Sequence, residues 1–169
     1  QRYGDRHHTS HVWIVRPGRT KKGGYDILLQ KRSPNKDSFP GCYDISSAGH
    51  IPAGQDYLPS ALRELEEELG ISALAKQLEF IGCYDSVCQS EFHGKPFHNH
   101  EYSAVYMLFC DMDASAMTIQ EEEIEEVIWI DYEDCLEGIK NNTFPHCIFM
   151  EEIKMLGRAL CRHAKDPAM

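Results

Sequence analysis

The chain of 169 residues is long enough for a globular domain with a buried core, since 42% of its residues are hydrophobic and 10% are aromatic. Its formal net charge of −10 argues against binding to nucleic acid or anionic lipid through bulk electrostatics, because such partners select basic surfaces. No apolar run approaches the roughly 20 residues that span a bilayer, and no signal-peptide pattern begins the sequence. We therefore expect a single domain over residues 1–169, cytoplasmic, without nucleic-acid or membrane partners.

Cysteine usage favours a reducing compartment. The chain has seven cysteines, an odd number, and none forms a C-x-x-C pair. Several lie inside apolar runs, where a cysteine is typical of a small core residue. The seven are expected to stay reduced in a cytosol-like environment. Because the sequence begins with Gln1 rather than Met, it leaves open whether a segment precedes it.

The first half of the chain predicts strands separated by loops. Ser10–Val15 and Tyr25–Lys31 are rich in β-branched and apolar residues, and the Gly-, Pro- and Lys-rich segment between them predicts a hairpin-like loop. The stretch "KRSPNKDSFPG" is expected to be a loop, and "CYDISSAG" a short strand. A helix is predicted over Pro59–Leu69, with proline in its first turn and Gly70 directly after its end.

The second half predicts three more strands, in "QLEFIGCY", "EYSAVYMLFC" and "EEVIWID". Helices are expected over Tyr132–Lys140 and Ile148–Lys165, the second with an apolar face of Phe149, Ile153, Leu156 and Leu160. Strands and helices mix without strict alternation, which predicts an α/β sandwich with a mixed sheet. The apolar N-terminal strand and the cysteine-containing C-terminal helix leave room for a homodimer.

Residues 85–100, "DSVCQSEFHGKPFHNH", are expected to form the longest loop and to contact substrate through their histidine and aromatic side chains. Three nearby aromatic residues, Tyr84, Phe92 and Phe97, could stack on a nucleobase or line a slot for an isoprenoid chain. The sequence does not decide between these two kinds of ligand.

The segment "RELEEELG" concentrates carboxylates on a helix without any lysine. Glu64, Glu67 and Glu68 share one face of that helix, opposite the apolar face formed by Leu62, Leu65 and Leu69. Like charges at this spacing repel by a few tenths of a kcal/mol per pair. Taken alone, such a run is most often a solvated acidic face. Its alternative is a site for Mg²⁺ or Mn²⁺, hard cations that take oxygen ligands from a few carboxylates and share the rest with water and phosphates.

A wider pattern favours the metal site. Gly49, Gln55, Arg63-Glu64-Leu65, Glu67-Glu68 and Gly70-Ile71 follow one another at fixed spacing. The pattern resembles the Nudix box, G-x5-E-x7-R-E-U-x-E-E-x-G-U with U apolar, at every specified position except Gln55. The resemblance implies an α/β/α sandwich with a loop-helix-loop catalytic motif at residues 49–71. It also implies metal-dependent cleavage of a nucleoside diphosphate linked to some group X, or of a related organic diphosphate.

The same resemblance implies a role for each matching residue. Glu67 and Glu68 would be the principal metal ligands, with Glu64 a further ligand or the base that activates water. Arg63 would orient these carboxylates, and Gly49 would permit a tight turn and offer its carbonyl to metal. Gln55 would keep an oxygen ligand without the charge of glutamate, which leaves the number of metals open. One more acidic residue is expected from outside the box; the two possibilities are Glu101 and Glu123, and an ordinary exposed glutamate is the alternative for each.

The segment upstream of the box resembles the branch of isopentenyl diphosphate isomerase-like Nudix proteins of bacteria and plants. Arg32, Lys36 and Phe39-Pro40-Gly41 match an R-x3-K-x2-(W/F)-P-G stretch. By this resemblance Arg32 and Lys36 would bind the diphosphate; without it they would be ordinary loop charges. His11 and His50 match metal-binding histidines of the isomerases, with structural hydrogen bonding as the alternative.

Two features favour hydrolysis over isomerisation. Ala48 occupies the place of the isomerase cysteine, and Cys42 lies too far upstream in sequence to replace it. The chain also keeps the R-E-x2-E-E run that isomerases generally lack. The predicted function is a Nudix hydrolase acting on a small-molecule diphosphate. The alternatives are an isomerase-type enzyme and a catalytically silent module that only binds a diphosphate, which Gln55 would suggest.

Overall fold

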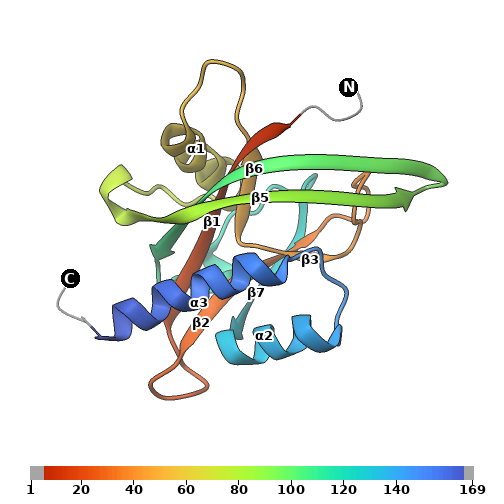
Figure 1. The fold of residues 1–169 in the computed structure, drawn as a ribbon. Helices are drawn as coiled ribbons and strands as arrows, with labels where there is room; N and C mark the ends of the chain where they lie inside the picture. Colours follow the sequence, from red (N-terminus) through yellow and green to blue (C-terminus); the bar gives the residue numbers. More distant parts are fainter. Residues whose placement is uncertain (1–5, 166–169) are drawn as a thin grey trace.

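The computed structural model describes residues 6–165, and within them one sheet of seven strands lies between helices (Figure 1). The strands are β1 (His7–Pro17), β2 (Tyr25–Arg32), β3 (Tyr43–Asp44), β4 (Ser47–His50), β5 (Leu78–Phe92), β6 (Lys95–Phe109) and β7 (Ile124–Asp131). The helices are α1 (Tyr57–Leu69), α2 (Tyr132–Asn141) and α3 (Met150–Lys165), with the short 3₁₀ turns η1 (Ala75–Gln77) and η2 (Ala114–Ala116). None of the helices within residues 6–165 is long and apolar enough to cross a membrane.

The sheet is mixed, as the sequence predicts. Its strand order is β3-β2-β1-β6-β5, with β4 paired to β1 and β7 paired to β2. Strands β1 and β6 run parallel, and the other pairs are antiparallel. Along one edge, β1 changes partner: Thr9–Val12 pair with β4, whereas Val15–Pro17 pair with β2. Strand β1 therefore pairs with β4 through its first half and with β2 through its second half. Its inner place also makes it unavailable as a surface for a homodimer.

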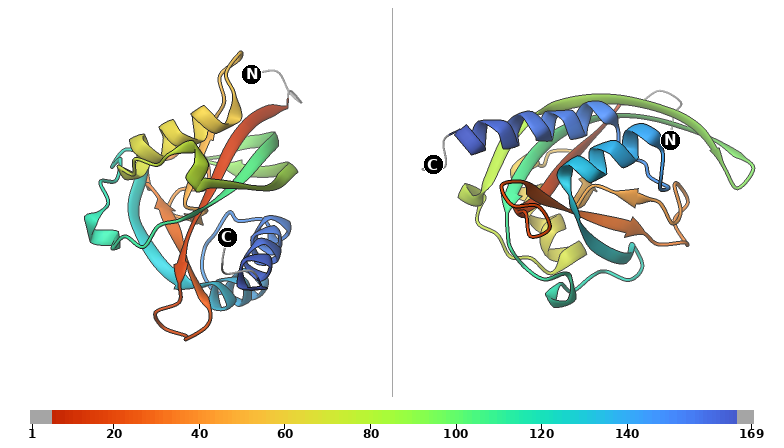
Figure 2. Two further views of the ribbon diagram at one scale, coloured as in Figure 1. Left: turned by 90° about the vertical axis from the view of Figure 1, so that its left-hand side faces the viewer. Right: turned by 90° about the horizontal axis from the view of Figure 1, so that it is seen from below.

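Two hydrophobic clusters fix the layers of the sandwich. Because successive side chains of a strand point to opposite faces, Val12 and Ile14 pack toward α1, whereas Trp13 and Val15 pack toward α2 and α3. Figure 2 shows α1 on one face of the sheet and α2 with α3 on the other. The α/β/α sandwich with a mixed sheet is confirmed. The strand is nearly continuously apolar because both of its faces are buried.

Most predicted elements are present with shifted ends. Helix α1 begins at Tyr57 rather than Pro59, and α3 begins at Met150 rather than Ile148. The segment predicted as one short strand forms two, β3 and β4. Phe149, predicted on the apolar face of the last helix, precedes α3 and is 37% exposed.

The prediction of a long loop at residues 85–100 is wrong. This segment belongs to a hairpin of β5 and β6, paired through the register Val87↔His100 and Cys88↔Asn99 and projecting beyond the rest of the sheet (Figure 1). A tight turn at His93 and Gly94, with φ values of 54° and 73°, connects the strands. One face of the projecting part looks into a cavity and the other into solvent. The sequence therefore lacks the alternation of apolar and polar residues by which a half-buried strand is detected.

Candidate active site

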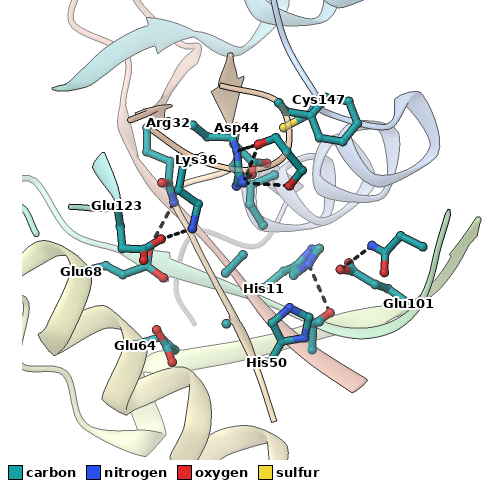
Figure 3. Close-up of a pocket in the computed structure, with 18 of the residues that line it drawn as sticks. His11, Arg32, Lys36, Asp44, His50, Glu64, Glu68, Glu101, Glu123 and Cys147 are labelled. Atoms are coloured by element: carbon teal, nitrogen blue, oxygen red, sulfur yellow. Dashed lines mark hydrogen bonds and ion pairs between the residues drawn. The ribbon is translucent and has the colours of Figure 1, made fainter. Parts of the chain in front are cut away.

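A cavity of about 920 Å³ lies where several elements meet (Figure 3). They are α1, the first half of β1, the end of β2, the β5–β6 hairpin and the start of α3. Most of the residues singled out from the sequence line it. They are Gly49, Glu64, Glu67, Glu68, Arg32, Lys36, Glu101 and Glu123, together with His11 and His50. Segments far apart in the chain thus bring the acidic helix, the basic pair and the two additional glutamates to one space.

Two carboxylates of α1 are pressed together at the cavity wall. Glu68 is only 6% exposed, and its Oε2 accepts a hydrogen bond of 3.1 Å from Nε2 of Gln30. Burial, the charge of Glu64 and a hydrogen bond with Glu64 together raise the pKa of Glu68 to about 9. Burial is also the main cause that raises the pKa of Glu64. Glu67 is exposed on the same helix and reaches the cavity from its rim.

Gly49 makes room for this pair. It lies on β4, and a Cβ atom placed there would come within 2.2 Å of Cγ of Glu64. No other residue type would fit without displacing the carboxylate. The glycine that begins the motif thus lets the β4 backbone approach Glu64 closely.

The chemistry of these groups fits a hard divalent cation. Among residues 6–165, no three His, Cys, Asp or Glu side chains form a ready-made metal cage. The close pair of Glu64 and Glu68 nevertheless needs a proton or a cation, because two carboxylates in a largely buried place repel one another. Oxygen ligands from a few carboxylates are what Mg²⁺ and Mn²⁺ take in proteins.

Gln55 and Arg63 lie outside the cavity lining. Nη1 of Arg63 donates a hydrogen bond of 2.8 Å to Oε1 of Gln55. The positive charge of Arg63 lowers the pKa of Glu64, opposing the larger effect of burial. Arg63 therefore influences Glu64 electrostatically from outside the cavity lining, and the side-chain oxygen of Gln55 already accepts a hydrogen bond from its guanidinium.

The basic pair is engaged with partners of its own. Nζ of Lys36 forms an ion pair with Oε2 of Glu123. Arg32 donates two hydrogen bonds of 3.1 and 2.9 Å to the Ser38 carbonyl and a longer one of 3.4 Å to Oδ2 of Asp44. Asp44 is a lining residue that the sequence analysis missed, and burial raises its pKa despite the charge of Arg32.

A buried ion pair forms the opposite wall. Nδ1 of His11 lies 2.6 Å from Oε1 of Glu152, whose other oxygen accepts a hydrogen bond of 2.9 Å from Nε1 of Trp13. Burial alone would lower the pKa of His11, but the charge and hydrogen bond of Glu152 raise it to about 9. Glu101, which accepts a hydrogen bond of 2.7 Å from Nδ2 of Asn99, adds to this effect.

Glu152 and Gln30 are two further lining residues that sequence reasoning missed. For Glu152 a signal existed: it lies at helical spacing before Leu156 and Ala159, on the buried face of α3, and it is only 2% exposed. A carboxylate in such a position needs a partner inside the protein. Gln30 follows the apolar residues of β2 and has no comparable signal.

Comparison with known sequences identifies relatives over most of the chain. The family model described as NUDIX domain matches residues 6–148. Nudix hydrolase 3 of Arabidopsis thaliana is 42% identical over 135 residues, which are 79% of this chain and 17% of the plant protein. An uncharacterized Nudix hydrolase of Clostridium acetobutylicum is 33% identical over 135 residues, which are 80% of this chain and 62% of that protein. The chain thus spans less than two thirds of the length of either relative.

Solved structures share the fold at low sequence identity. The NUDIX domain of NrtR from Shewanella oneidensis, solved in complex with ADP ribose, matches with a TM-score of 0.66 at 16% identity, over 94% of this chain and 90% of that one. A mutT/nudix family protein from Listeria innocua matches with a TM-score of 0.63 at 17% identity, over 93% of this chain and 95% of that one. Both likenesses bear on the fold alone.

Proposed function

The chain belongs to the Nudix family, and on that premise we propose that it is a metal-dependent hydrolase. Its substrate is a nucleoside diphosphate linked to a group X, or a related organic diphosphate. The observation that supports this most directly is the close pair of Glu64 and Glu68 in a cavity that also receives Arg32 and Lys36. A cation at the carboxylates and a diphosphate near the basic pair would satisfy the charges of both groups.

The metal ligands in this proposal are Glu64, Glu67 and Glu68, with the carbonyl of Gly49. When bound, Mg²⁺ or Mn²⁺ supplies a Lewis acid that lowers the pKa of water and neutralises charge on the phosphate oxygens. Gln55 is not included, because its oxygen accepts the hydrogen bond from Arg63 away from the cavity. The departure from the family pattern therefore changes the neighbour of Arg63 rather than the lining of the cavity.

The other residues bind the substrate and move a proton. Lys36 and Arg32 hold the phosphates, and each exchanges a carboxylate partner for a phosphate oxygen. Among the carboxylates that line the cavity, the candidates to accept the proton of the attacking water are Glu64, Glu101 and Glu123. Glu123 has one feature in its favour, because departure of Lys36 toward the diphosphate would free its Oε2 at the moment the substrate binds.

Isomerisation is less well supported than hydrolysis. Ala48 lines the cavity at the position of the isomerase cysteine, and Cys42 is absent from the lining formed by residues 6–165. The thiols in that lining, Cys88 and Cys147, come from β5 and from the segment before α3 rather than from that position. A reducing, cytoplasm-like compartment stays a prediction, based on the odd number of cysteines and the lack of a C-x-x-C pair. A homodimer stays a prediction, although β1, one of its two proposed surfaces, lies between other strands of the sheet.

The test is hydrolysis of a panel of organic diphosphates, including isopentenyl diphosphate, with Mg²⁺ and with chelator. We expect Mg²⁺-dependent release of a phosphate-containing product, reduced at least about 100-fold in Glu67→Gln. The matched control is Glu66→Gln, an exposed position on the same helix outside the cavity lining, which should retain the wild-type rate. Near-full activity of Glu67→Gln with Mg²⁺ contradicts the proposal. Tight binding without turnover indicates a silent module, and an alkene shift without phosphate release indicates an isomerase.

A further inference from the structure

Three phenylalanine rings meet where the projecting hairpin faces the loop after β2. Phe92 and Phe97 come from β5 and β6, and Phe39 comes from the loop. The ring centroids are 4.6, 5.2 and 6.0 Å apart, with interplanar angles of 67°, 72° and 87°. Phe39 and Phe97 line the cavity, and Phe92 supports them from outside the lining. This edge-to-face packing holds the two lining rings in place.

The backbone of Phe39 is held in an unfavourable conformation. Its φ of 48° lies in the left-handed region, which is rare for a bulky aromatic residue and persists only where the surroundings enforce it. Arg32 contributes to this restraint, because Nη2 donates a hydrogen bond of 2.9 Å to the carbonyl of the preceding residue, Ser38. The arginine expected to bind the diphosphate thus also restrains the backbone next to Phe39.

Polar groups follow the rings along the same face of the hairpin. Phe97, Asn99 and Glu101 alternate along β6 and all line the cavity. Nδ2 of Asn99 donates a hydrogen bond to Oε1 of Glu101. The amide oxygen and the second amide hydrogen of Asn99 have no partner among residues 6–165. A donor and an acceptor therefore lie side by side next to the Phe97 ring.

These features distinguish between a hydrocarbon and a heteroaromatic ligand. At this end of the cavity a hydrocarbon chain would cover the amide of Asn99 without pairing with it, which is unfavourable. A planar ring with hydrogen-bonding edges can stack on a phenyl ring and pair with an amide in two hydrogen bonds, as adenine does with asparagine. Four residue steps along β6 separate Phe97 from Glu101 by about 13 Å, which leaves room for a linker between this ring and the reacting diphosphate.

We propose that Phe39, Phe97 and Asn99 form a subsite for the organic part of the diphosphate substrate. The subsite selects a planar, hydrogen-bonding aromatic group, such as a purine base. The proposal rests on the proposed function, because it takes the diphosphate to lie between α1 and the basic pair. The sequence leaves open whether the ligand carries a nucleobase or an isoprenoid chain. The proposal is that the hairpin selects the base.

The experiment compares three uncleavable ligands that share one head group: methylenediphosphonate, α,β-methylene-ADP and the geranyl ester of methylenediphosphonate. Their affinities are measured by calorimetry with and without Mg²⁺ for the full chain. We expect the wild type with Mg²⁺ to bind α,β-methylene-ADP at least about tenfold more tightly than methylenediphosphonate, and more tightly than the geranyl ester. Stacking and the two hydrogen bonds supply this difference.

Variants test which residues provide the preference. Phe97→Leu removes the ring but keeps an apolar side chain, and Asn99→Leu removes the amide at similar volume; each should reduce the tenfold ratio by about threefold or more. Gln89→Ala is the matched control, because Gln89 is exposed on β5 opposite His98 and lies outside the lining. It should keep the wild-type ratio.

The outcomes separate this inference from the proposed function. If methylenediphosphonate binds with Mg²⁺ but α,β-methylene-ADP binds no more tightly, or the geranyl ester binds best, the subsite is wrong and the metal-diphosphate site stands. If α,β-methylene-ADP binds equally well without Mg²⁺ and loses affinity in Phe97→Leu, the subsite stands and the proposed metal-diphosphate site is wrong. Failure of all three ligands to bind overturns both.

Discussion

Glu68 brings a carboxylate into a nearly water-free position on α1, where 6% of the residue is exposed. Gln30 offers one hydrogen bond to it, but Glu64 brings a second negative group to the same place. Burial and this neighbouring charge raise the pKa of Glu68 to about 9, so the metal-free site holds a proton that a divalent cation would displace. The arrangement that is unfavourable alone becomes favourable with the cation.

The substitution Glu68→Gln separates these two states. Without metal the variant should unfold within about 2 °C of the wild type, because the amide resembles the neutral, protonated carboxyl in size and charge and still accepts a hydrogen bond from Gln30. With Mg²⁺ the wild type should gain thermal stability through binding, and the variant should lose most of that gain. Thermal unfolding followed by circular dichroism, with Mg²⁺ or chelator, measures both effects. A full Mg²⁺ shift in Glu68→Gln would exclude this residue as a ligand.

Glu152 is a second buried carboxylate, but it has partners within the protein. Removing it by Glu152→Ala leaves the His11 ring and the indole of Trp13 without their acceptor. Breaking a buried pair in this way costs about 3–5 kcal/mol of unfolding free energy. Glu152→Gln should cost less, since its amide oxygen can still accept from Trp13. Urea unfolding measures the loss, and Lys154→Ala, an exposed change on the same helix, should stay within about 0.5 kcal/mol of the wild type. An equally small loss in Glu152→Ala would mean that the pair contributes nothing to stability.

At the scale of elements, predictability depends on how many faces are buried. The sequence predicts α1 well, because Leu65 and Leu69 repeat at helical spacing and pack on the sheet. It predicts β1 and β2 because both are continuous apolar runs. The sequence wrongly predicts a loop for the outer part of the β5–β6 hairpin. Its inner face carries Ser86, Cys88 and Asn99 for the cavity, and its outer face carries solvated residues. Because the inner face lines the cavity with polar residues, this part of the hairpin lacks the apolar pattern from which a strand is predicted.

The turn of that hairpin offers a test of the element. His93 and Gly94 both have positive φ, the combination of a type I′ turn, which favours Asn-Gly. Gly94→Ala should destabilise the projecting hairpin by about 1 kcal/mol, because an alanine at φ 73° is strained. His93→Asn should stabilise it by a few tenths of a kcal/mol. Hydrogen exchange of the amides in residues 85–100, read by mass spectrometry, reports both changes. Faster exchange in His93→Asn than in Gly94→Ala would contradict the turn assignment.

At the scale of the whole molecule, only part of the site has a local signal. Glu64 and Glu68 lie four residues apart on one helix, so their spacing predicts that they meet, whereas a place for Gly49 beside them is implied by the resemblance to the family motif. Asp44 and Glu152 reach the same cavity from β3 and α3. Their approach follows from the change of partners along β1 and from the packing of α3, which no local pattern specifies. Glu152 also lies beyond the residues that the family model matches, so this wall of the cavity is not implied by family membership.

The contact between α3 and β1 makes the stability of the whole molecule depend on pH. Glu152 on α3, Glu101 on β6 and Asp44 on β3 face His11, and against the effect of burial they raise its pKa from 6.5 to about 9. A group whose pKa is higher in the folded state stabilises it fully below its unfolded pKa, and this contribution is lost as pH rises through the folded value. We therefore expect the free energy of unfolding to fall by on the order of 3 kcal/mol between pH 6.5 and 9. Urea unfolding at several pH values measures this slope. The experiment is done in excess Mg²⁺ because, if the proposed function holds, bound metal keeps the α1 carboxylates from titrating. Glu152→Gln removes the main charge that raises the pKa of His11, so its slope should be clearly smaller. An equal slope in the variant, or stability that rises over this range, would show that the His11–Glu152 pair is not the source of the dependence.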